Sequence, residues 1–144
     1  MVNGGTLYTR EVLALATSLS QWPHDAGMPF QGAARSATCG SSLALSLAVD
    51  GAGRITGIGL RPQACAIGQA SAALFAQSAI GQGAEAIAAQ LEAIRQWLKN
   101  GAAMPGWPGL SAIAAARDYP ARHGAITLPW EAALVALCST AKPG

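Results

Sequence analysis

The feature that most constrains the fold is the segment 42–49, in which apolar and small residues alternate strictly. Period-two alternation predicts a β-strand with one buried face. The glycine-rich residues 50–53 predict a turn, and residues 54–61 predict a return strand, so an antiparallel hairpin is expected. The residues expected on the buried faces are Leu43, Leu45, Leu47 and Val49 in the first strand, with Ile58 and Leu60 in the second.

The rest of the chain is mostly helical in character, with apolar residues at spacings of three and four or with a high alanine content. The expected helices lie at 6–19, 66–80, 84–99 and 110–116, with a last one within 120–137. Thr6 is expected to cap the first helix. Pro129 implies either a kink in the last helix or a restart with Pro129 in its first turn.

Residues 20–38 read as loop with a short extended piece near 33–37. Strands that cluster early and helices that follow indicate an α+β fold. We expect a small antiparallel sheet of about three strands, with helices packed on one face. The length of 144 residues suits a single domain spanning 1–144.

Composition excludes several classes of function. Apolar residues make up 51% of the chain and charged residues 11%, so the chain is not disordered. A net charge of +2 with scattered basic residues argues against nucleic-acid binding. The longest charge-free stretch, 62–84, carries several glutamines, and no signal peptide is apparent, so we expect a cytoplasmic protein without a membrane segment.

Two cysteines flank the predicted hairpin. Cys39 precedes its first strand, and Cys65 follows its second at the start of a helix, where the helix dipole favours a thiolate. Because the two ends of a hairpin meet, we expect the two sulfurs within about 7 Å of each other. Cys138, with apolar neighbours in the last helix, is interpreted as packing, and His24 as a surface loop residue.

The motifs around these cysteines resemble the IscU/SufU family of iron–sulfur cluster assembly scaffolds, which includes the N-terminal domain of NifU. The resemblance rests on Thr-Cys-Gly-Ser at 38–41, Cys-Ala-Ile-Gly-Gln-Ala-Ser-Ala at 65–72, and the segments 119–122 and 127–130. The long interval between Cys65 and the segment 119–122 resembles the SufU-type branch, which carries an insertion there. In the family, three cysteines and one aspartate surround a metal or a cluster.

The chain departs from this pattern at two ligand positions. Ser41 stands where the family has the aspartate, and Ala125 falls at the third cysteine. The resemblance therefore implies a site for iron, an iron–sulfur cluster or zinc, with Cys39, Cys65 and His123 as ligands. Zinc and clusters ordinarily take four donors, so this site is expected to bind weakly.

The resemblance implies a cluster-assembly scaffold or a sulfur carrier rather than a catalyst. Its partners would be a cysteine desulfurase and apo-proteins that accept clusters, with Cys39 as the sulfur acceptor. A zinc-bound sulfur-transfer protein is a variant of this function. The alternative is a divergent paralogue that binds no metal and docks to the assembly machinery to regulate it.

Overall fold

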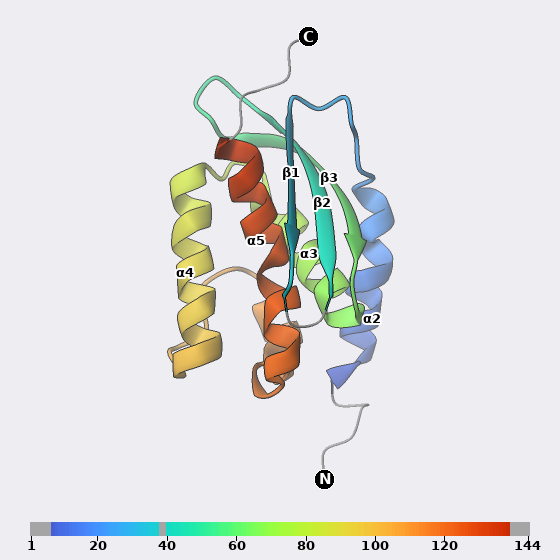
Figure 1. Cartoon of the computed structure of the whole chain (residues 1–144), viewed down its shortest axis with the longest axis vertical. Helices are drawn as coiled ribbons and strands as arrows, with labels where there is room; N and C mark the ends of the chain where they lie inside the picture. The colour runs from blue at the N-terminus through green and yellow to red at the C-terminus, as the bar shows by residue number, and fades with distance from the viewer. Residues whose placement is uncertain (1–6, 38–39, 139–144) are drawn as a thin grey trace.

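The structure, a computed structural model, describes residues 7–37 and 40–138. Its centre is a three-stranded antiparallel sheet in the order β1–β2–β3, which confirms the predicted α+β fold (Figure 1). The strands are β1 (Phe30–Arg35), β2 (Ser42–Val49) and β3 (Ile55–Gln63). The helices are α2 (Arg10–Thr17), α3 (Ala66–Ala79), α4 (Ala84–Asn100) and α5 (His123–Cys138), with 3₁₀ helices η1 (Ser18–Gln21), η2 (Leu110–Asp118) and η3 (Pro120–Arg122).

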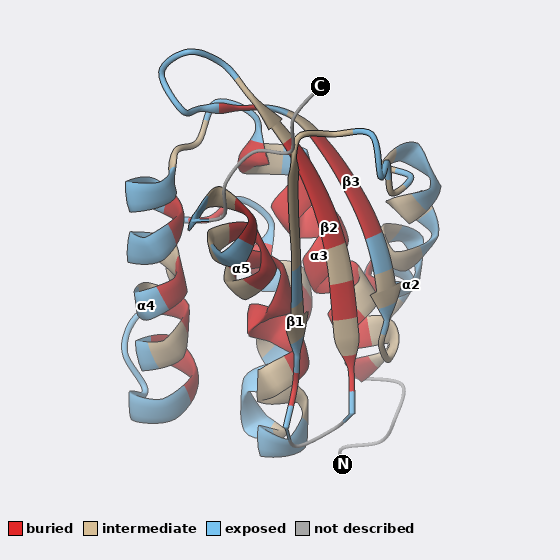
Figure 2. Cartoon of the chain, turned by 45° about the horizontal axis from the view of Figure 1, so that its top comes forward, coloured by how far each residue is buried: buried red, intermediate tan, exposed pale blue. Residues whose placement is uncertain are grey.

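The helices pack against the sheet and against one another. Helices α3 and α5 contact both the sheet and each other, α4 packs on α5, and α2 packs on α3. Figure 2 shows that α4 is buried along the side facing α5 and exposed along the opposite side. None of the helices within the described ranges is long and apolar enough to cross a membrane.

The predicted hairpin is confirmed as β2 and β3. Leu43, Leu45 and Leu47 are at most 2% exposed. Leu45 lies opposite Leu60 of the partner strand. Since β2 is the central strand, its leucines lie in the middle of the sheet, where α5 packs across β1 and β2 while α3 packs on β3.

The first strand is longer than the extended piece expected near 33–37, because β1 begins at Phe30. Its sequence conceals the strand, since Gly32 stands where a core side chain would be expected. A Cβ at Gly32 would overlap the backbone of α5 at Ala132 and Ala136. The missing side chain lets α5 approach β1 directly, which is a requirement of the tertiary structure that strand propensity does not reveal.

Two helix predictions need correction. The first helix, α2, begins at Arg10 rather than at residue 6, and the Oγ1 of Thr9 accepts the Val12 amide hydrogen at 3.1 Å as its N-cap. The expected cap, Thr6, lies outside the described residues. A restart of the last helix at Pro129 is wrong, because α5 continues through it. Pro129 is buried, and packing on both sides of α5 offsets the lost backbone hydrogen bond.

A cluster of three aromatic rings fixes α5 against α3. Phe75 stacks on Trp107 with ring centroids 5.4 Å apart, and Trp130 of α5 meets both rings edge-on. Trp107 also donates from Nε1 to the Leu74 carbonyl oxygen at 2.9 Å. These contacts set the position of α5, whose first residues lie at the end of the sheet where β1 and β3 end and β2 begins (Figure 1).

Candidate functional site

The two segments that carry the predicted functional cysteines meet at one end of the sheet. Ser42, the first residue of β2, pairs with Gln63, the last residue of β3. On the other side, the Ser36 amide donates to the Ser41 carbonyl oxygen at 2.8 Å, so residues 37–40 connect β1 to β2 at this end. The expected meeting of the hairpin ends is therefore confirmed. Cys39 itself, and the expected distance between the sulfurs, lie outside the described residues.

Cys65 is the N-cap residue of α3. Its backbone is extended, and its carbonyl oxygen accepts the Gln69 amide hydrogen at 2.9 Å, but its side chain makes no capping hydrogen bond. The thiol is half-buried and packs against the edge of the core. The backbone of Cys65 thus caps the first turn of a long helix, and the sulfur takes no part in the capping hydrogen bonds.

The two positions that the resemblance aligns with further ligands of the family, Ser41 and Ala125, are buried. Ser41 is 5% exposed and Ala125 is fully buried. Ala125 faces the start of α3, because a Cβ on Gly68 would lie 3.2 Å from the Ala125 Cβ and 2.7 Å from that of Ala64. The residue at the third cysteine position therefore lies beside the segment that carries Cys65, and its methyl group has no donor atom.

His123, the first residue of α5, faces a different side of that helix. Residues two apart on an α-helix differ by about 200° in direction, so His123 and Ala125 diverge. Its Nε2 lies 2.7 Å from the Arg117 carbonyl oxygen. Since a carbonyl only accepts, Nε2 carries the proton, and Nδ1 is the nitrogen left for another partner.

The described residues hold no group of three or more His, Cys, Asp or Glu side chains placed to bind a metal ion. Because Cys39 is outside that set, the predicted ligand trio of Cys39, Cys65 and His123 stays a prediction. Cys138 is exposed at the end of α5, so its interpretation as packing is wrong. His24 is half-buried in the loop that crosses Gly59 of β3.

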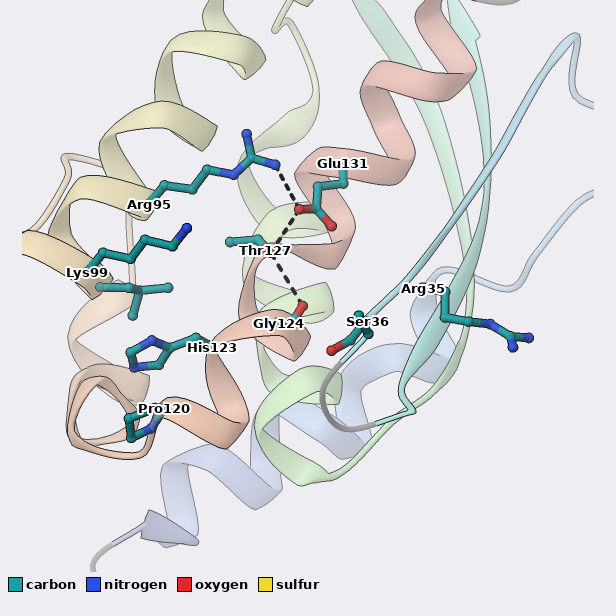
Figure 3. Close-up of a pocket in the computed structure, with 11 residues that line it drawn as sticks. Arg35, Ser36, Arg95, Lys99, Pro120, His123, Gly124, Thr127 and Glu131 are labelled. Atoms are coloured by element: carbon teal, nitrogen blue, oxygen red, sulfur yellow. Dashed lines mark hydrogen bonds and ion pairs between the residues drawn. The ribbon is translucent and has the colours of Figure 1, made fainter.

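Sequence reasoning missed a cavity of about 570 Å³ beside this end of the sheet, between β1, α4 and α5 (Figure 3). Charged and polar side chains project into it from two helices. The available signal was helical spacing: Arg95 and Lys99 are four residues apart, as are Thr127 and Glu131. That the α4 pair lies opposite the α5 pair depends on how the two helices pack, and the sequence carries no signal for it.

Comparisons with known proteins support the resemblance to the scaffold family. No protein-family model and no curated protein matches the sequence. Among solved structures, the N-terminal part of a nitrogen-fixing NifU-like protein from Brucella abortus matches with a TM-score of 0.83 and 26% identity, over 92% of this chain and 93% of that one.

A second match is a protein from the thermophilic Fervidobacterium islandicum AW-1, described as an iron–sulfur cluster assembly scaffold for the SUF system. Its TM-score is 0.80 at 18% identity, over 94% of this chain and 99% of that one, and it supports the fold. The fold, the identity with the NifU-like domain and the cysteine-bearing segments at one end of the sheet together confirm the resemblance to the IscU/SufU/NifU N-terminal family.

Proposed function

We propose that this protein acts in iron–sulfur cluster assembly, as a scaffold or a sulfur acceptor, through Cys39 and Cys65. The observation that carries this proposal is the pairing of Ser42 with Gln63. Cys39 stands three residues before Ser42 and Cys65 two residues after Gln63, which supports a site that both thiols share at this end of the sheet.

In the proposed transfer, Cys39 accepts sulfur from a cysteine desulfurase that carries a persulfide. The Cys39 thiolate attacks the outer sulfur of that persulfide, the sulfur–sulfur bond breaks, and the desulfurase thiolate leaves. The product is a persulfide on Cys39, with no net oxidation or reduction. Cys39 is favoured over Cys65 because it lies in a connection between two strands, whereas Cys65 is tethered as the cap of α3.

A cluster or a metal ion would be the cargo of this site. The donors proposed are Cys39, Cys65 and the Nδ1 of His123. Its other ring nitrogen, Nε2, is hydrogen-bonded to the Arg117 carbonyl oxygen. Ser41 and Ala125 supply neither carboxylate nor sulfur. A [2Fe–2S] cluster takes four donors, so we propose that one chain holds it weakly, with an external thiol or a second chain, before release to an apo-protein. Zinc bound by the same donors would also be open to water.

One observation favours a second function. Both vacated ligand positions are buried and filled by small side chains, with Ala125 packed against α3. This packing suits a paralogue that has lost the metal and docks to the cluster-assembly machinery as a regulator. That function needs the surface of the fold but not the thiol of Cys39.

Persulfide mapping separates the two functions. The protein is incubated with a cysteine desulfurase and cysteine, and the sulfur-labelled cysteine is identified by peptide mass spectrometry. The scaffold proposal expects labelling of the wild type and of Cys65→Ser, and its loss in Cys39→Ser. Cys138→Ser is the matched control, since Cys138 is an exposed thiol distant in sequence from both segments. Equal labelling of Cys39→Ser and the wild type removes Cys39 from this role.

A further inference from the structure

The cavity between β1, α4 and α5 is a second place on this molecule with the chemistry of a binding site. Its volume of about 570 Å³ lies within the range of small-molecule sites. Figure 3 shows Arg95 and Lys99 reaching in from α4, with Thr127 and Glu131 opposite them on α5. Residues 35–37, at the end of β1, line the third side.

The one acidic side chain that lines the cavity is already neutralised. Glu131 Oε2 lies 2.9 Å from Arg95 Nη2 and 3.2 Å from Thr127 Oγ1. Thr127 Oγ1 is also within 3.3 Å of the Gly124 carbonyl oxygen, which fixes the hydroxyl between two acceptors. Glu131 is therefore held on the α5 wall as half of an ion pair, and it leaves no free negative charge in the cavity.

The remaining charge is positive and unpaired. Among the described residues, Arg95–Glu131 is the one ion pair, so Lys99 has no carboxylate within 4.0 Å. Arg35 also lines the cavity on the β1 side, with its side chain extending outward in Figure 3, whereas Lys99 reaches in from α4 without a carboxylate partner. The cavity also opens at the first turn of α5, where the helix dipole is positive.

We propose that this cavity binds a small organic anion, with its oxyanion group held by Lys99 near the first turn of α5. The volume exceeds what a bare phosphate or carboxylate needs. Apolar surface from Leu98 and Pro120 lines the same cavity and would take the carbon body of the ligand. His123, proposed above as a metal ligand, also lines the cavity, but the proposal rests on Lys99 and the apolar wall and does not need sulfur transfer at Cys39.

The test is a titration of the full chain followed by amide NMR shifts at constant ionic strength. The probes are phenyl phosphate and benzoate, with benzyl alcohol as the neutral counterpart. We expect saturable shifts at Lys99 and Gly124 with the anions and none with benzyl alcohol. Binding of both anions defines the ligand class as an oxyanion on an apolar body, whereas binding of one identifies it as a phosphate or a carboxylate.

Lys99→Gln should weaken the binding of the anions about tenfold, since a hydrogen bond to a charged group is lost. Arg54→Gln is the matched control, because it removes the same charge from the exposed β2–β3 turn at the opposite end of the sheet. Failure of both anions to saturate, equal binding of benzyl alcohol, or an unchanged affinity in Lys99→Gln would overturn the proposal.

Discussion

Gly68 of α3 and Ala125 of α5 pack so closely that a Cβ on Gly68 would lie 3.2 Å from the Cβ of Ala125. Because of this close contact, the first residues of α5 pack against the first turn of α3, which follows Cys65. The position that holds the third cysteine in the family is therefore next to the proposed thiol site, and here it carries a methyl group. Ala125 therefore offers no donor atom at the position that the resemblance aligns with this ligand.

The first prediction concerns this missing donor. Restoring the family pattern with Ser41→Asp and Ala125→Cys should raise the affinity for zinc by about tenfold or more, because each change adds a ligand atom at a position where the resemblance implies one. The measurement is competition with a chromophoric chelator, alongside circular dichroism to check folding. An unchanged affinity in a folded double variant would mean that another group already completes the site.

The second prediction tests the packing of the two helices. At an exposed helix position, glycine to alanine stabilises by about 1 kcal/mol. At Gly68 the new methyl would lie 3.2 Å from the Ala125 Cβ of α5 and 2.7 Å from the Ala64 Cβ, so the backbone must shift. We expect Gly68→Ala to lower the free energy of unfolding by about 1–2 kcal/mol, measured in urea.

The control for that variant is Gly51→Ala, since a Cβ at Gly51 has no neighbour within 4 Å. This variant should leave the free energy of unfolding within about 0.5 kcal/mol of the wild type. Equal stability of the two variants would show that α3 and α5 pack less tightly at this point than the structure indicates.

The third prediction is a pH dependence of the hairpin turn. Asp50 Oδ1 accepts the amide hydrogens of Arg54 and Ala52 at 3.0 and 2.8 Å, and these bonds lower the pKa of Asp50 from its ordinary value of 3.8. Because the pKa of Asp50 is lower in the folded state than in the unfolded state, its carboxylate stabilises the fold fully above pH 3.8. That contribution is lost as the pH falls through the pKa of the folded state.

Thermal unfolding of the wild type and Asp50→Asn between about pH 5 and 2 checks this prediction. The wild type should lose stability with falling pH more steeply than Asp50→Asn, whose side chain does not titrate. Parallel curves for the two proteins would contradict the assigned role of the Asp50 carboxylate.

How far the sequence predicts this protein depends on whether a feature is local. The alternating leucines at Leu43, Leu45 and Leu47 identify the central strand, because burial of one face follows a period of two. The sequence does not predict the start of β1 at Phe30, because Gly32 lacks the side chain that would mark a strand. Its missing side chain leaves room for the backbone of α5. The continuation of α5 through Pro129 likewise depends on burial by neighbouring elements.

The same distinction applies to the sites. Chain order alone predicts that the two ends of the hairpin meet, and the pairing of Ser42 with Gln63 confirms it, whereas the shared site of Cys39 and Cys65 stays a prediction. The cavity beside Lys99 could not, because Arg95 meets Glu131 only when α4 packs on α5. Likewise, the bond from His123 to Arg117 depends on how η2 meets α5.

The central claim is that Cys39 and Cys65 share one site, and disulfide formation under mild oxidation tests it most directly. In a Cys138→Ser background, diamide should produce an intramolecular disulfide between Cys39 and Cys65, detected by peptide mapping. Such a bond requires Cα atoms within about 7 Å of each other. If both thiols instead stay free and are alkylated in full while the protein remains folded, the two cysteines do not share a site.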